Sequence, residues 1–149
     1  MLKNLNPLLN ADLLHTLRAM GHGDEIVLVD ANFPAHSVAQ RLIRLDGADM
    51  IQAGEAILSV LPLDSFVEHT VLRMEVVGKP DELPEIQQQF QHIVDTSAGR
   101  SIAIGGIERH AFYQRAKQAY AVVATGERRA YGCFILIKGV IKPDGSVWW

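Results

Sequence analysis

Cysteine is almost absent from this chain of 149 residues, in which Cys133 is the only one. A single thiol cannot close an internal disulfide, and it cannot hold zinc by itself. The composition therefore favours a reducing compartment, and we expect a cytoplasmic protein.

Long apolar runs and an excess of positive charge are also missing. No uninterrupted apolar stretch approaches the roughly 20 residues that cross a bilayer, and Pro7 with its polar neighbours interrupts the first segment before a signal-peptide core can form. The 14 basic and 17 acidic residues give a formal charge of −3, which offers no electrostatic footprint for a polyanion. We expect neither a membrane nor a nucleic acid as a partner.

Motifs for nucleotides and metals are incomplete. The "GHGD" stretch at 21–24 has Ile26 where a dinucleotide loop needs its third glycine, and it follows a predicted helix instead of a strand. The six histidines form no HxH or HExxH spacing, so we predict neither a metal site nor a cofactor. A metal-dependent hydrolase that uses these histidines is the alternative in this class, and elemental analysis would detect its zinc or manganese.

Apolar periodicity and turn residues predict alternating helices and strands. A first helix follows Asn10 and stops before His22, where Gly21 would take the left-handed conformation. Further helices are predicted near Pro34, over 48–63 with Pro62 as the terminator, over 81–98 and over 108–118. Strands are predicted over 25–31, 41–45, 70–78, 101–107, 119–125 and 133–141. Because parallel strands need crossovers, we predict an α/β fold: a single three-layer domain over 1–149 with a largely parallel sheet covered by helices.

His22 is the first candidate for chemistry, since it stands between two glycines at the end of the first predicted helix. An imidazole changes charge near neutral pH and can act as acid or base, and the glycines leave room for a ligand. The alternative is a histidine that only caps the helix, where a cation is favoured.

Asp30 follows the first predicted strand, at the edge of the sheet where ligands tend to bind. Its carboxylate can accept hydrogen bonds from sugar hydroxyls, and the alternative is a cap for the helix near Pro34. Arg109 and Tyr113 share a helix face and could present a guanidinium and a phenol to a polyol, although a surface ion pair would also explain the arginine. Tyr131 either binds a ligand through its hydroxyl or only packs its ring.

Several of these residues form a pattern in chain order: Gly21-His22-x-Asp24, Asp30-Ala31, Pro34, Gly126-Glu127 and Tyr131. In this order the sequence resembles the family of L-fucose mutarotases and D-ribose pyranases over roughly residues 1–140. Residues 141–149 are a C-terminal extension. The stretches "FPAHS" at 33–37, "RHAFYQRA" at 109–116 and "TGERRAYG" at 125–132 are more similar to the fucose branch.

The resemblance implies a cofactor-independent isomerase that interconverts the α and β anomers of a monosaccharide. L-Fucose is the first expectation, and pyranase activity on ribose is a further one. It implies that His22 transfers the proton and that Asp30, Arg109 and Tyr131 bind the sugar. It also implies a ring-like homo-oligomer, often a decamer, with sites near subunit contacts.

Two positions depart from the family pattern. Cys133 stands where the family commonly has Asn, and Asn32 stands where related mutarotases can have His. A thiol is a poor substitute for an amide donor and acceptor. The alternative function is therefore a non-catalytic monosaccharide-binding or regulatory protein that keeps the pocket without turnover. Trp148 and Trp149 end the chain, either buried against a neighbouring subunit or as a loosely packed tail.

Overall fold

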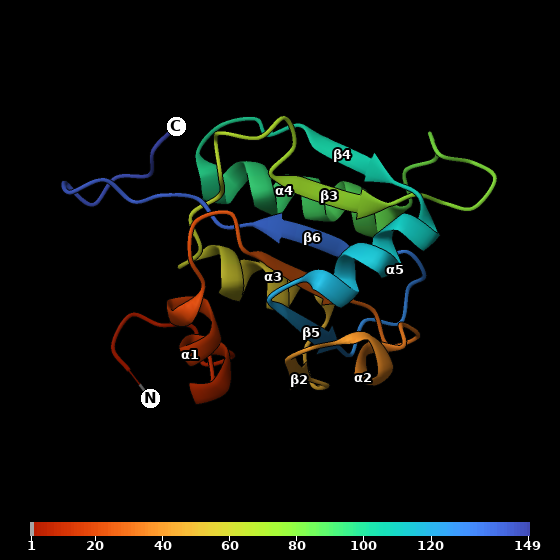
Figure 1. Ribbon diagram of the computed structural model, residues 1–149, viewed down its shortest axis with the longest axis horizontal. Coiled ribbons are helices and arrows are strands. Elements are labelled where there is room, and N and C mark those ends of the chain that lie inside the picture. Colours follow the sequence, from red (N-terminus) through yellow and green to blue (C-terminus); the bar gives the residue numbers. More distant parts are fainter. Residues whose placement is uncertain (1) are drawn as a thin grey trace.

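A six-stranded sheet with helices on both faces forms the protein, and the computed structural model describes residues 2–149 (Figure 1). The strands are β1 (Glu25–Val29), β2 (Leu42–Leu45), β3 (Val71–Met74), β4 (Ile104–Ile107), β5 (Ala121–Thr125) and β6 (Phe134–Ile137). The helices are α1 (Ala11–Ala19), α2 (Ala35–Val38), α3 (Met50–Leu58), α4 (Glu85–Ala98) and α5 (Arg109–Gln118). The predicted three-layer α/β architecture is confirmed.

The sheet has the strand order β2-β5-β1-β6-β3-β4, and β6 is its one antiparallel member among the described strands. Leu136 of β6 pairs with Ile26 on one side and with Val71 on the other. The other five strands point the same way, so their carboxyl ends meet at one edge of the sheet and their amino ends at the opposite edge. The prediction of a largely parallel sheet is therefore confirmed.

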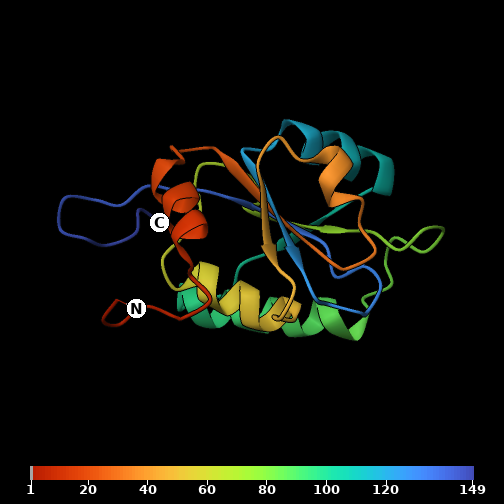
Figure 2. The ribbon, with the colours of Figure 1, turned by 90° about the horizontal axis from the view of Figure 1, so that it is seen from below.

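Both faces of the sheet are apolar, because side chains alternate along each buried strand. On β1, Ile26 and Leu28 face the cluster formed with α1, α3 and α4. Val27 and Val29 face the cluster formed with α2 and α5. Figure 2 shows α3 and α4 on one side of the sheet and α2 and α5 on the other.

The helix boundaries follow the capping residues. Asn10 caps α1 as predicted, because its side chain accepts a hydrogen bond from the backbone N–H of Leu13. Helix α3 starts with a capping box between Asp49 and Gln52. It ends at Leu58, before the end predicted from Pro62, with Ser59 as its C-cap.

Strand β4 contains the adjacent glycines Gly105 and Gly106. A Cβ at Gly105 would lie 2.7 Å from the His69 ring, so the absence of a side chain allows His69 to pack against this strand. Among residues 2–149, no helix combines the length and the apolar character needed to cross a membrane.

Candidate active site

The turn between α1 and β1 presents His22 at the surface. Gly21 donates its backbone N–H to the Asp24 carboxylate at 2.7 Å, and Gly23 donates to the carbonyl of Lys138 at 2.8 Å. The left-handed residue is Gly23, with φ +83°, and not Gly21 as the sequence predicted. The reason is that α1 leaves its last turn in an extended conformation at Met20, so the chain reverses two residues later than expected.

Asp64 lies directly beside the imidazole of His22. The His22 Nε2 is 3.1 Å from the Asp64 Oδ1, and the side-chain exposures are 48% for His22 and 2% for Asp64. The same carboxylate oxygen accepts from the backbone N–H of Phe66, and the backbone N–H of Asp64 donates to the Thr70 hydroxyl. An ionised carboxylate only accepts hydrogen bonds, so this contact places the hydrogen of a neutral imidazole on Nε2 and leaves Nδ1 as the base.

Sequence reasoning missed Asp64. It lies 42 residues from His22 along the chain, and no local motif joins them. A signal exists, because Asp64 precedes β3, whose amino end shares the sheet edge with the amino end of β1. Because β6 lies between β1 and β3, this shared edge narrows the candidates without pairing the two residues.

Asp30 lies at the opposite end of β1 and is buried. Its Oδ1 accepts the backbone N–H of Asn32 at 2.9 Å, and its Oδ2 accepts the Cys133 thiol at 3.4 Å. Burial, and then the charge of Asp30, raise the pKa of the Cys133 thiol well above its usual value, so the thiol is protonated and donates. The thiol that replaces the family asparagine therefore contacts Asp30, the residue expected to bind the sugar.

A cavity of about 460 Å³ opens beside Asp30. It is lined by the α2 segment, by Arg44 of β2, by Asp46 just after this strand, and by the end of β5 around Thr125. This cavity lies at the carboxyl edge of the parallel strands, where a ligand site is expected in such sheets.

Tyr131 lies on the same edge, two residues before Cys133. Its backbone has φ +63°, a left-handed conformation that is uncommon outside glycine and that often marks a functional position. Its hydroxyl accepts a long hydrogen bond of 3.3 Å from the backbone N–H of Val77, and its carbonyl accepts from the Gln87 side chain. Only a single contact occupies the phenol oxygen, which leaves it able to donate to a ligand.

Arg109 begins α5, after the carboxyl end of β4. Glu108 caps this helix by accepting from the backbone N–H groups of His110 and Ala111, and these bonds lower the pKa of its carboxyl. Among residues 2–149, the Arg109 Nε is the one buried side-chain nitrogen or oxygen found without a hydrogen-bond partner. A buried donor without a partner is costly, and a bound ligand is one way to satisfy it.

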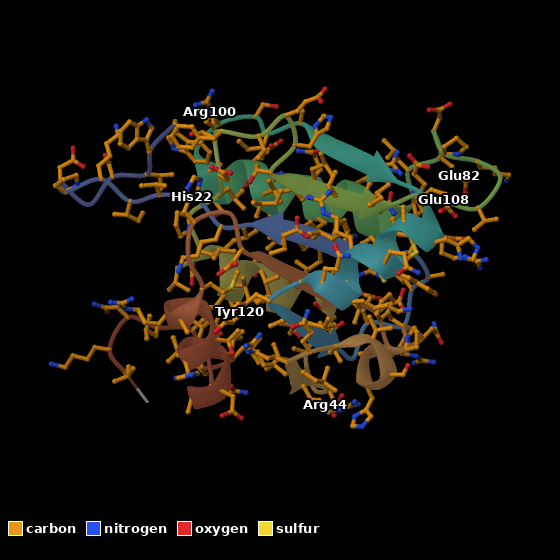
Figure 3. The ribbon with its side chains drawn as sticks, in the orientation of Figure 1. His22, Arg44, Glu82, Arg100, Glu108 and Tyr120 are labelled. Atoms are coloured by element: carbon orange, nitrogen blue, oxygen red, sulfur yellow. The ribbon has the colours of Figure 1, made fainter. Side chains whose placement is uncertain are left out.

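The four residues predicted to form one site lie at two edges of the sheet. Asp30, Arg109 and Tyr131 follow the carboxyl ends of parallel strands or precede β6, whereas His22 precedes β1. Figure 3 shows His22 on one side of the molecule and Glu108, the neighbour of Arg109, on the far side. We call His22 and Asp64 the histidine half-site, and we call Asp30, Arg109 and Tyr131 the carboxylate half-site, of which Asp30 is the member that lines the cavity.

Comparison with known proteins gives a family. The RbsD / FucU transport protein family matches residues 3–141. The chain belongs to this family. The resemblance predicted from the sequence motifs is thereby confirmed, and residues 142–149 lie beyond the matched region.

Relatives within the RbsD/FucU family are similar over nearly their whole length. The L-fucose mutarotase of Haemophilus influenzae strain 86-028NP is 43% identical over 140 residues, which cover 94% of this chain and 97% of the relative. The crystal structure of the fucose mutarotase from Streptococcus pneumoniae in complex with L-fucose is 42% identical with a TM-score of 0.88, covering 95% of this chain and 100% of that one. The structure of protein Atu2016 is 53% identical with a TM-score of 0.92, and the match covers 95% of this chain and 97% of that one.

Among residues 2–149, no group of three or more His, Cys, Asp and Glu side chains is arranged to hold a metal ion. The chemistry of the two half-sites is that of hydrogen-bond donors, acceptors and one titratable ring.

Proposed function

We propose that this protein is a cofactor-independent mutarotase that interconverts the α and β anomers of L-fucose. The observation that carries the proposal is the imidazole of His22, exposed to solvent on one side and hydrogen-bonded to the buried Asp64 on the other. The identity of 42% to a fucose mutarotase solved with L-fucose supports the choice of sugar.

Anomer exchange needs only proton transfer. The anomeric hydroxyl loses a proton, the bond between the anomeric carbon and the ring oxygen breaks, and the ring oxygen gains a proton. Rotation of the open-chain aldehyde and reclosure then give the other anomer. A positioned acid or base contributes roughly 10²- to 10⁴-fold to such a step, and His22 is the residue to which we assign the transfer.

Sugar binding belongs in this proposal to Asp30, Arg109 and Tyr131. The carboxylate accepts hydrogen bonds from sugar hydroxyls, while the unpartnered Nε of Arg109 and the Tyr131 hydroxyl donate to them. The cavity beside Asp30, about 460 Å³, has a volume suited to a small ligand.

A complete site requires two chains in this proposal. Strand β1 separates His22 from Asp30, and its five residues span about 17 Å, more than the width of a monosaccharide. Two copies that place the histidine half-site of one against the carboxylate half-site of the next would form a head-to-tail contact, and such contacts form a ring when the rotation between successive copies closes. A ring-shaped homo-oligomer, with a decamer as the specific expectation, and a cytoplasmic location complete the proposal.

Exchange NMR tests the catalytic assignment. Saturation transfer between the anomers of L-fucose is measured with the wild type, with His22→Ala and with His92→Ala, whose histidine lies exposed on α4. We expect acceleration by the wild type and by His92→Ala, and its loss in His22→Ala. Equal exchange rates in the His22 and His92 variants would rule out the role of His22. D-Ribose, L-rhamnose and D-galactose in the same assay define the preferred sugar and any pyranase activity.

A non-catalytic sugar-binding protein is the second candidate, and the contact of Cys133 with Asp30 favours it. The Cys133 Sγ lies 3.4 Å from the Oδ2 of Asp30 and so occupies one oxygen of the residue proposed to bind the sugar. A thiol also cannot supply the hydrogen bonds of an asparagine amide. This function predicts that L-fucose binds in calorimetry while exchange is not accelerated. Cys133→Asn should then restore exchange if this position is responsible.

A further inference from the structure

Two exposed aromatic rings stand beside His22. Phe66 is 60% exposed and Trp148 is 48% exposed. The Phe66 ring centroid lies 5.4 Å from that of His22 in an edge arrangement, and the Trp148 and Phe66 centroids lie 5.9 Å apart. His22, Phe66 and Trp148 thus form a continuous row, and we call the pair of Phe66 and Trp148 the aromatic wall.

The aromatic wall draws one ring from the C-terminal extension. The chain reverses at Gly145, whose φ is +86°, and Ile141 forms a bridge with Val147 on the way back. Figure 3 shows His22 on the side of the molecule where this extension lies.

Hydrogen bonds hold the returning segment in place. The backbone N–H of Trp148 donates to the carbonyl of Val140 at 2.9 Å, and the Ser65 hydroxyl donates to the carbonyl of Trp148 at 2.6 Å. Ser65 is the residue between Asp64 and Phe66, so the extension is attached to the loop that orients the imidazole. Trp148 lies outside the family match, which ends at residue 141.

Exposed aromatic rings next to a titratable group are typical of a ligand site. A 6-deoxy sugar has an apolar surface made of its ring C–H groups and its methyl group, and this surface stacks on aromatic rings while the hydroxyls face polar groups. We propose that the aromatic wall binds this apolar surface while His22 transfers protons, and that Trp148 gives a preference for 6-deoxy sugars. This inference rests on the proposed function and deepens it.

The proposed preference for 6-deoxy sugars has a physical cause. Against the Trp148 ring a methyl group loses contact with water, which is favourable, whereas a hydroxymethyl group would lose hydrogen bonds to water that the ring cannot replace. L-Galactose differs from L-fucose only by the hydroxyl at carbon 6. The ratio of kcat/KM for these two sugars therefore reports the contact with the wall.

The first test compares Trp148→Ala with Trp149→Ala in the exchange assay. Trp149 is the matched control because it is also half-exposed, and it lies under the Arg100 guanidinium instead of against Phe66. We expect Trp148→Ala to raise the KM for L-fucose roughly 3- to 10-fold and to lower the L-fucose to L-galactose preference by a similar factor, with kcat nearly unchanged. Trp149→Ala should match the wild type.

Equal KM values and equal preference in the two variants would overturn the role of Trp148 even where the wild type exchanges anomers rapidly. Light scattering accompanies the assay. A fall in the mass of Trp148→Ala without a change in KM would assign this ring to a subunit contact and would also overturn the proposal.

Fluorescence separates a failure of this inference from a failure of the proposed function. The chain has two tryptophans, so Trp149→Phe leaves Trp148 as the sole indole. We expect L-fucose to change the emission of Trp149→Phe and not that of Trp148→Phe. This outcome in a protein that does not accelerate exchange would keep the aromatic wall and refute the mutarotase. No emission change in Trp149→Phe at saturating L-fucose would refute the wall.

Discussion

The His22 imidazole is hydrogen-bonded through Nε2 to the buried carboxylate of Asp64, 3.1 Å away. The Asp64 carboxylate also accepts the backbone N–H of Phe66, and the Asp64 backbone N–H donates to the Thr70 hydroxyl, so Asp64 is a rigid support for the ring. Orientation by a carboxylate selects which nitrogen of the ring carries the hydrogen. We therefore expect Asp64 to position the ring for the proton transfer proposed for His22.

Asp64→Asn should lower kcat for L-fucose exchange by about 10- to 100-fold, the effect of losing a hydrogen bond to a charged group. If Asp64 had only a structural role, a folded Asp64→Asn variant would keep the hydrogen on the same nitrogen of the His22 ring. Nitrogen-15 NMR of His22 should therefore show the Nε2-protonated form in the wild type and a mixture of forms in Asp64→Asn. An unchanged nitrogen spectrum together with an unchanged kcat would remove Asp64 from the mechanism.

Tyr131→Phe tests the carboxylate half-site. The phenol oxygen has one long contact, to the backbone N–H of Val77, so its loss should change the free energy of unfolding little. We expect the KM for L-fucose to rise about 3- to 10-fold, because one hydrogen bond to the sugar is lost. A KM equal to that of the wild type would show that this hydroxyl does not contact the sugar.

Glu127 makes the free energy of unfolding depend on pH in the acidic range. It is buried and accepts hydrogen bonds from the Arg129 side chain and backbone, and these with the Met50 N–H lower the pKa of its carboxyl to about 2. A carboxyl with a depressed pKa in the folded state stabilises that state fully above its unfolded pKa of about 4.5 and loses this contribution as the pH falls toward 2. The contribution is of the order of 2 kcal/mol, reduced by the solvent around the half-exposed Arg129.

Denaturant unfolding of the wild type and of Glu127→Gln checks this window. The two proteins should differ in the free energy of unfolding by a constant amount above about pH 5.5, and the difference should shrink between about pH 4.5 and 2. A difference that does not vary with pH would mean that the hydrogen bonds of Glu127 do not depend on its charge.

The sequence was sufficient to predict the helices and strands and to place Asp30 at the carboxyl edge of the sheet. Apolar runs placed β1 and β5, and Asn10 placed the start of α1, because strand burial and helix capping are local properties. The position of β6 between β1 and β3 was not predictable in the same way. Its antiparallel pairing is decided by tertiary packing, and no short stretch of its sequence encodes it.

The candidate site shows the same division. The exposure of His22 follows from its glycine-flanked turn, and the location of Asp30 follows from the end of a strand, so both are visible in the sequence. Asp64 and the row through Phe66 to Trp148 are contacts between distant segments, and only the folded chain brings them together. The length of β1 already implied that His22 and Asp30 lie far apart within one chain. The prediction that they form one site did not take this length into account.

Subunit mixing gives the sharpest test of the two half-sites. His22→Ala and Asp30→Asn should each abolish exchange, since each removes one half of every site. Asparagine keeps the oxygen that accepts the Asn32 N–H, so Asp30→Asn should still fold.

If a site takes His22 from one chain and Asp30 from its neighbour, then random co-assembly of the two variants at equal amounts restores about one quarter of the sites. If both residues act within one chain, no assembled site is intact and the mixture stays inactive. The measurement is L-fucose exchange after co-refolding, with each variant refolded alone as the control. An inactive mixture whose mass by light scattering matches that of the wild type would exclude a site shared between chains.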